Sequence, residues 1–331
     1  EKRYLQRIRP SATLIPNDWF QFHVQIQDAR AFASDAASSA GLANTFDIRE
    51  AYGEIRETES RRWGLRLGRQ ELSFGDERLI GADCEWCNLG RSFDGARLWF
   101  GSSKYRVDCF ASSVVEPVNG RWDRPFGGDQ LYGVHSSIIA SRNSAVLEPY
   151  LLWKHASGAL GESGSQADLD VYTFGLRAVG SFGSKLGYTF EIARQTGQAA
   201  QARISTWAGY WEFSYRFGRP DAGRRLWLAY SRASGDDDPA DDRWGTFDDL
   251  YPAGYNECGT MEPFAWRNIQ DVAAGGECRL SRRWSLAANY HSYWLADTAD
   301  VDDRLREVPQ RVFRLLGVPI LLAVVLVKES D

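Results

Sequence analysis

The chain has 331 residues, of which 44% are hydrophobic and 25% charged, and its formal net charge is −5. The acidic balance, with no basic stripe, excludes a typical nucleic-acid-binding protein. The mean hydropathy of −0.41 would suit a soluble domain, but a transmembrane β-barrel has a similar average because only every second strand residue meets lipid. The 13 Trp and 14 Tyr residues are typical of membrane–water interfaces, although a soluble β-protein with an aromatic core would also contain them.

Alternation of apolar and polar residues predicts β-strands along the chain. In residues 19–26, Phe20, Phe22 and Val24 form one face, and Gln21 and His23 form the other. This pattern places one face in an apolar medium and the other in water or a polar interior. The same alternation occurs in residues 171–178, 207–216 and 285–294. About fourteen such strands can be counted, many of them as long as a tilted strand needs to be to cross a membrane.

The connectors between these strands alternate between short and long. The short ones are residues 16–18, 58–60, 102–104, 141–144, 182–185, 219–223 and 281–283. The long ones are residues 33–45, 75–90, 116–129, 157–167, 196–203 and 235–264. Short periplasmic turns and long extracellular loops are typical of outer-membrane β-barrels. The fold class predicted is therefore all-β, an antiparallel transmembrane β-barrel.

The direction of the strands adds an expectation about their number. With short turns in the periplasm, the first strand (residues 4–14) runs inward and the last clear strand (residues 284–296) runs outward. Bacterial barrels have an even number of strands and periplasmic termini. We therefore expect strands to be missing at both ends.

Several segments together resemble the alginate export family of outer-membrane barrels. They lie at residues 5–9, 27–30, 68–81, 90–98, 234–239, 245–248, 266–271, 290–291 and 294–297. The longest reads Gly-Arg-Gln-Glu-Leu-Ser-Phe-Gly-Asp-Glu-Arg-Leu-Ile-Gly. The resemblance implies a monomeric barrel of roughly eighteen strands in the bacterial outer membrane, with an arginine-rich lumen that passes an anionic, alginate-like exopolysaccharide. It also implies periplasmic export components as partners.

The resemblance ends after Asp300, which suggests two parts. Residues 1–299 are interpreted as a partial barrel, and residues 300–331 as a divergent tail that is frame-shifted or disordered. The apolar run near the end of the chain is too short for a spanning helix, and Pro319 would interrupt a central strand.

Strand parity identifies the candidate transport residues. The arginines predicted to point into the lumen are Arg7, Arg9, Arg66, Arg97, Arg177, Arg216 and Arg279. A polyanion that crosses a low-dielectric region needs positive charge along its path, and arginine stays charged at physiological pH. Glu191 and Glu212 are counted with this path, and the same parity places Asp108, Glu148, Asp271 and Glu277 inside.

The alternative is that these acids and arginines pair across strands only to neutralise buried charge. Arg49 and Arg69 are left outside the main set, because parity is ambiguous in residues 46–55 and slips near Gly68, where a bulge is expected.

Evidence for other functions is weak. The pair Cys84 and Cys87 has the spacing of redox and zinc sites, but a loop disulfide or inert thiols explain it better. The acidic cluster at residues 236–242 lacks EF-hand spacing and is interpreted as a solvated loop. The four histidines lie on separate strands without a nucleophile motif of the Gly-x-Ser-x-Gly type, so no catalytic residue, metal or cofactor is predicted. A general porin, a sugar-uptake channel, and a barrel that carries an outer-membrane enzyme or adhesin are the alternatives to polysaccharide export. The expected partners are anionic polysaccharide or small anions and the lipid of the outer membrane, with no nucleic acid.

Overall fold

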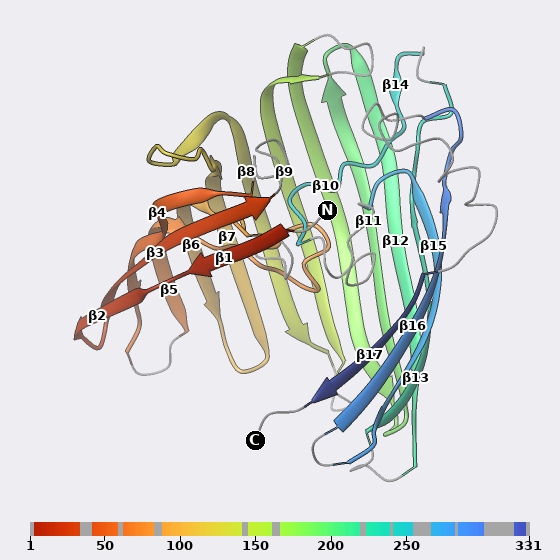
Figure 1. The fold of residues 1–331 in the computed structure, drawn as a ribbon. Helices are drawn as coiled ribbons and strands as arrows, with labels where there is room; N and C mark the ends of the chain where they lie inside the picture. The colour runs from red at the N-terminus through yellow and green to blue at the C-terminus, as the bar shows by residue number, and fades with distance from the viewer. Residues whose placement is uncertain are drawn as a thin grey trace.

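The computed structural model describes residues 3–33, 42–58, 62–82, 88–140, 145–160, 166–218, 223–238, 241–253, 266–281, 284–300 and 321–328. All regular elements in these ranges are β-strands, which form one curved sheet (Figure 1). No helix in the described ranges is long and apolar enough to cross a membrane. The predicted all-β fold is confirmed.

The strands follow one another in chain order. Their bounds are β1 Arg3–Ile8, β2 Ser11–Asn17, β3 Phe20–Ala33, β4 Asn44–Arg56, β5 Trp63–Gln70, β6 Phe93–Gly101, β7 Tyr105–Glu116, β8 Arg124–Ile139, β9 Val146–Leu160, β10 Gln166–Phe182, β11 Leu186–Ala199, β12 Ala202–Phe217, β13 Arg224–Ala233, β14 Arg243–Trp244, β15 Ile269–Arg279, β16 Trp284–Leu295 and β17 Leu321–Lys328.

Nearly every strand pairs antiparallel with the next one. β1 and β2 both pair with β3 and are two segments of the predicted first strand, interrupted at Pro10. Proline has no N–H to donate to the ladder. β14 is a short parallel addition to β12, so β13 pairs directly with β15. With β1 and β2 taken as one strand, and β14 and β17 set aside, the fourteen strands predicted from the sequence are present.

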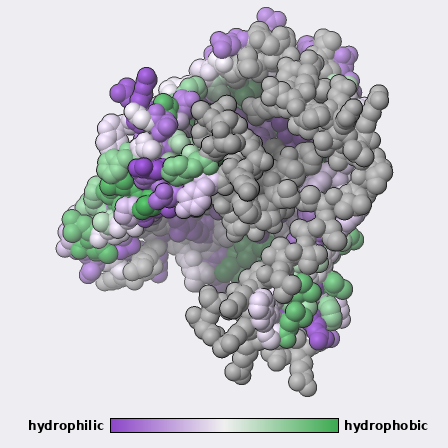
Figure 2. Space-filling view, viewed as in Figure 1, coloured by the Kyte–Doolittle hydropathy of each residue, from purple (hydrophilic) through white to green (hydrophobic). Residues whose placement is uncertain are grey.

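The two faces of the sheet differ in polarity. Along β10, the exposed fractions of Phe174 and Leu176 are 51% and 42%, whereas Thr173 and Arg177 on the other face are buried. Figure 2 shows hydrophobic side chains gathered on the outer side of the first strands, at the left of the view. The outer face therefore suits lipid, and the inner face is polar.

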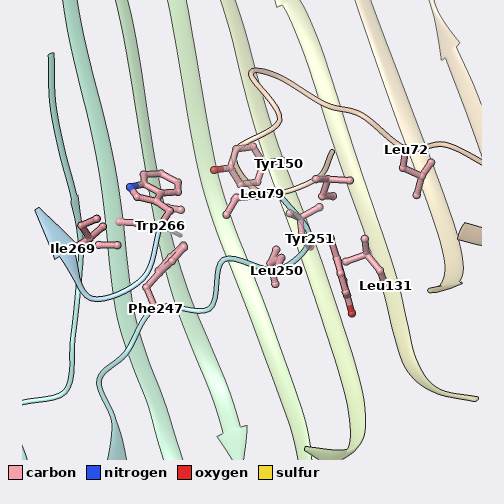
Figure 3. Close-up of a cluster of buried hydrophobic side chains, with 14 of the residues drawn as sticks. Leu72, Leu79, Leu131, Tyr150, Phe247, Leu250, Tyr251, Trp266 and Ile269 are labelled. Carbon is pink, nitrogen blue, oxygen red and sulfur yellow. The ribbon is translucent and has the colours of Figure 1, made fainter. Parts of the chain in front are cut away.

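Two connectors fold against the inner face. Residues 71–82 follow β5, and residues 245–253 lie between β14 and β15. Their apolar side chains form a buried cluster with inner side chains of the strands. Figure 3 shows Leu79, Leu250 and Tyr251 from these connectors near Leu131 and Tyr150 of the wall.

The predicted alternation of connector lengths is only partly right. Residues 71–92 and 234–268 are long, as expected, but the connector expected at 196–203 is a turn of Ala200 and Gln201. The connector expected at 116–129 covers only residues 117–123. Polar composition predicts loops here, but strands that extend past the lipid into water are polar too.

The final described segment, β17, pairs antiparallel with β16. No register among the described residues joins β17 to β1 or β2. The division of the chain at Asp300 stays a prediction.

Candidate functional site

The two connectors inside the barrel, which we call the inner loops (residues 71–82 and 245–253), bind each other by backbone hydrogen bonds. The N–H of Gly81 donates to the carbonyl of Tyr251 over 2.8 Å, and the N–H of Tyr251 donates to the carbonyl of Leu79 over 2.9 Å. The N–H of Ala253 donates to Glu77 over 3.0 Å. The result is a short parallel bridge centred on Ile80 and Tyr251. Gly81 is required here because a Cβ at this position would lie 2.4 Å from the Cβ of Ala253.

The inner loops are attached to the wall by charged groups. The Nζ of Lys154 on β9 donates to both carboxylate oxygens of Asp248, at 2.9 and 3.1 Å. The Tyr251 hydroxyl donates to Asp129. The side chain of Gln195 on β11 donates to the carbonyl of Asp248 over 2.6 Å. The loop at 245–253 is thus held by both its backbone and its side chains.

A compact charge cluster lies where the loop at 71–82 meets β9, β10 and β11. Arg177 on β10 donates through Nε to Asp76 over 3.0 Å and also pairs with Glu148. Arg78 pairs with Asp76 at 3.0 Å and with Glu191 at 2.9 Å. We call these five residues the covered cluster. Three carboxylates surround two guanidiniums, so each arginine has two acidic partners.

Aromatic side chains complete the covered cluster. The guanidinium of Arg78 lies 3.7 Å from the ring centre of Tyr210, and the Tyr150 hydroxyl donates to Glu191 over 2.9 Å. A small pocket beside it is lined by Phe74, Leu79 and His135, among others. The exposed fractions of the Arg78 and Glu191 side chains are 4% and 6%. Ion pairs buried to this degree need all their partners, because a single unpaired charge is costly there.

The second charge cluster lies on β4 to β7. Arg66 and Arg97 are direct neighbours in the register of β5 and β6. Arg66 pairs with Glu54 at 2.7 Å, and Arg97 pairs with Asp108 at 2.9 Å. Arg106 also pairs with Asp108, at 2.7 Å.

Arg56 adds a fourth arginine, with its Nη1 3.6 Å from Glu54. We call Arg56, Arg66, Arg97, Arg106 and the two acids the arginine cluster. Its four guanidiniums share two carboxylates, and the Arg106 side chain is 48% exposed. These six side chains together therefore carry more positive than negative charge.

Aromatic rings accompany the arginine cluster. Guanidinium carbons lie 4.0 Å from the ring centre of Tyr52 (Arg66), 5.0 Å from that of Phe74 (Arg97) and 5.3 Å from that of Trp99 (Arg106). Such stacking fixes the plane of a guanidinium, while the N–H groups at its edge point away from the ring.

The other predicted path residues are spread along the inner face. Arg9 donates to Gln27 over 2.6 Å and to the carbonyl of Leu89 over 3.1 Å. Arg7 lies opposite the buried Ala29 on the edge strand. Glu212 accepts from Tyr210 over 2.9 Å and pairs with Arg225.

Arg216 lies opposite Arg225 in the register of β12 and β13, and Arg279 ends β15; both are exposed. The assignment of these residues to a transport path stays a prediction. The structure brings together Arg66 with Arg97, and Arg177 with Glu191.

Some charged residues were missed or set aside. In the pairing of β3 with β4, Gln25 is opposite Glu50 and Ile26 opposite Ile48, so Arg49 is a bulged residue. Arg49 is buried and pairs with Glu71 at 2.7 Å. The bulge explains why alternation was ambiguous here.

No register shift occurs at Gly68, whose irregularity is instead a φ of 124°. Arg69, which parity also left aside, pairs with Asp94 at 2.8 Å. Arg78 was missed because it lies in a loop, where parity gives no information.

Two predictions on loops have different outcomes. The acidic cluster at 236–242 is exposed, as predicted, at Asp237, Asp238, Asp241 and Asp242. Asp236 is the exception: it is buried and accepts from the N–H groups of Gly245 and Asp238, at 2.6 and 2.9 Å. In the described ranges, no group of three or more His, Cys, Asp or Glu residues could hold a metal ion. Cys84 and Cys87 lie outside the described residues.

Burial and charge set the pKa values of the inner-loop acids. Burial would raise the pKa of Asp76, but Arg78 and Arg177 outweigh it and hold the pKa below its ordinary value. Lys154 does the same for the pKa of Asp248, against the effect of burial. For Asp249, burial and the neighbouring Asp248 raise the pKa. The carboxylates that bind the wall therefore stay ionised near neutral pH.

A curved antiparallel sheet with an apolar outer face, a charged inner face and loops folded inside defines an outer-membrane β-barrel channel. Solved porins share this fold at low identity. The chain resembles Pseudomonas aeruginosa OccK2 (OpdF) in complex with glucuronate, with a TM-score of 0.60 and 13% identity over 87% of this chain and 74% of that one. It also resembles OpdK with vanillate from the same species, with a TM-score of 0.59 and 11% identity over 87% and 79% of the two chains. For P. aeruginosa OpdO the TM-score is 0.56, with 13% identity over 88% and 78%.

The model of the alginate export family matches residues 1–312. The chain therefore belongs to the alginate export family, and it resides in the bacterial outer membrane. No curated protein matched the sequence. Family and fold together indicate a channel rather than an enzyme.

Proposed function

We propose that this channel passes anionic polysaccharide or smaller anionic sugars, and that the arginine cluster selects them. The observation that carries the proposal is the ratio of charges within the arginine cluster, where four arginines share Glu54 and Asp108. Like charges directly opposite each other on neighbouring strands are destabilising. Arg66 and Arg97 adopt this arrangement, and an anion between them would relieve it.

The chemistry of the cluster suits a sugar acid. Guanidinium groups donate paired hydrogen bonds to carboxylates, and they stay charged at any physiological pH. The neighbouring Trp99, which is only half-buried, offers an aromatic surface against which the apolar face of a pyranose can pack. Uronic acids combine both features in every residue of the polymer.

The covered cluster does not share this role in our proposal. Its arginines each have two carboxylate partners; Arg78 belongs to the loop at 71–82, and Arg177 lies on the wall against that loop. We infer that they hold the inner loop rather than meet solute. Of the arginines predicted for the path, Arg66 and Arg97 therefore select the anionic solute, and Arg177 holds the inner loop.

Single-channel recordings in planar bilayers test this function. Oligomers of uronic acid added to one side should block the current of the refolded protein in a concentration-dependent manner. Neutral oligosaccharides of equal length are the control and should block far less. Equal block by both sugars would contradict the proposal and indicate a general porin or a sugar-uptake channel. Absence of any conductance from a correctly refolded barrel would favour a platform for an enzyme or adhesin.

A further inference from the structure

A row of stacked aromatic side chains marks a level on the outer face of β8 to β10. Tyr132, Trp153 and Tyr172 are cross-strand neighbours, and their ring centres are 4.7 and 5.7 Å apart. Aromatic residues of this kind collect at the membrane–water interface. Two residues further toward the short turns, Leu151 and Phe174 are exposed as apolar, lipid-facing side chains.

One step beyond this row, toward the end of the barrel that carries the long loops, three polar groups form a chain. The Nδ1 of His155 on β9 lies 3.0 Å from Oδ1 of Asp170 on β10. The Nε2 of the same ring lies 3.3 Å from the hydroxyl of Ser157. His155 and Asp170 are direct register partners, and Ser157 shares their face because it is two residues from His155.

The hydrogen bonds fix the roles of the imidazole nitrogens. A carboxylate only accepts, so the neutral imidazole has its proton on Nδ1 and donates it to Asp170. Nε2 is then an acceptor for the Ser157 O–H. Trp153 Nε1 also donates to Oδ1 of Asp170, over 2.9 Å, and fixes the carboxylate. This is the connectivity by which a serine hydroxyl is activated in hydrolases.

Space for a reacting ester is present beside the serine. The next residue, Gly158, has a φ of 69°, and a Cβ at its position would have nothing within 4 Å. The backbone N–H that follows a nucleophilic serine commonly binds the oxyanion in serine hydrolases. The exposed outer face gives a lipid direct access to Ser157.

We propose that Ser157, His155 and Asp170 form a second, hydrolytic site on the lipid-facing surface, which cleaves carboxylic esters of membrane lipids. The aromatic row puts the serine at the level where acyl esters join lipid headgroups, with water available from outside.

The reaction has two steps. Oγ of Ser157 attacks the ester carbonyl while His155 takes its proton; the bond between carbonyl carbon and alcohol oxygen breaks, and the alcohol leaves with that proton. Water then attacks the acyl-serine and gives a proton to His155, which returns it to Ser157 as the fatty acid departs. In this mechanism Ser157 and His155 are catalytic, and Asp170 is a positioning residue. The site is independent of the channel function, and it departs from the expectation that no catalytic residue is present.

The test uses the full chain refolded in detergent, with correct folding checked by heat-modifiable migration on a gel. Mixed micelles of phosphatidylethanolamine are one substrate and lipopolysaccharide is the other, and released fatty acid is measured. We expect release from one of them, labelling of Ser157 by a fluorophosphonate, and at least a 100-fold loss of both in Ser157→Ala. Asp170→Asn should lower kcat and leave KM unchanged. Ser205→Ala is the matched control, because Ser205 is an outer-face serine near the same barrel end that contacts Arg194 instead of a histidine; it should keep full activity.

Labelling of the wild-type protein, mapped to its peptide, tests the site even if Ser157→Ala fails to fold. A folded wild-type barrel that neither releases fatty acid nor reacts with the fluorophosphonate overturns the proposal. So does a folded Ser157→Ala variant with undiminished hydrolysis.

Discussion

The covered cluster and the arginine cluster contain the same residue types but differ in their ratio of arginines to carboxylates and in their burial. In the covered cluster, Arg78 of the inner loop and Arg177 of the wall are surrounded by three carboxylates. In the arginine cluster, four guanidiniums share two carboxylates, and Arg106 is about half exposed. Charge balance and cover, rather than the mere presence of arginine, distinguish a structural ion-pair network from a surface that attracts anions. Simple neutralisation of buried charge explains the covered cluster, whereas the arginine cluster has two guanidiniums more than it needs to neutralise Glu54 and Asp108.

The largest effect should come from breaking the covered cluster. Arg177→Ala leaves Asp76 and Glu148 without this partner in the interior, and removal of one member of a buried pair costs about 3–5 kcal/mol. We expect a marked fall in the urea midpoint of the detergent-refolded barrel, measured by tryptophan fluorescence. Arg30→Gln is the control, since Arg30 pairs with Asp28 at an exposed position. If the urea midpoint of Arg177→Ala were unchanged, the covered cluster would not be a structural ion-pair network, and it would not differ from the arginine cluster in this respect.

A smaller effect should follow from separating the inner loops. In Gly81→Val the new side chain meets Ala253, whose backbone nitrogen would lie 2.5 Å from the Cβ. Overpacking of this kind costs about 1–3 kcal/mol. The cost should fall on the bridge between the loops, so limited proteolysis should cut them faster and the channel current should rise.

Gly127→Val is the matched control for this variant, because a Cβ at Gly127 has nothing within 4 Å. Equal protease resistance in the two variants would show that the bridge does not hold the loops.

The smallest effect concerns pH. Burial raises the pKa of Asp123, in the connector 117–123, to about 6. The folded state therefore holds this proton more tightly than the unfolded chain between about pH 4 and pH 6. This contribution to stability is present at low pH and is lost as the pH rises through 6. When the pH rises from 5 to 7.5, the urea midpoint of the wild-type protein should fall relative to that of Asp123→Asn. The same pH response in both proteins would refute this assignment.

The sequence predicted the strands, because a period of two residues directly reports which side chains share a face. It did not predict Arg49, since one bulged residue reverses parity, or Arg78, since a loop has no period. The sequence also does not show which side chains pair with each other. The meeting of Arg177 with Asp76, or of His155 with Asp170, depends on loop placement and strand register, which alternation along one strand does not contain.

Ion selectivity tests the central claim most directly, because it asks whether the arginine cluster attracts anions. The reversal potential of single channels in a KCl gradient should show anion preference in the wild-type protein. The double variant Arg66→Gln, Arg97→Gln should shift it toward zero or to cation preference, while Arg30→Gln should leave it unchanged. A folded double variant with the wild-type reversal potential would contradict the account.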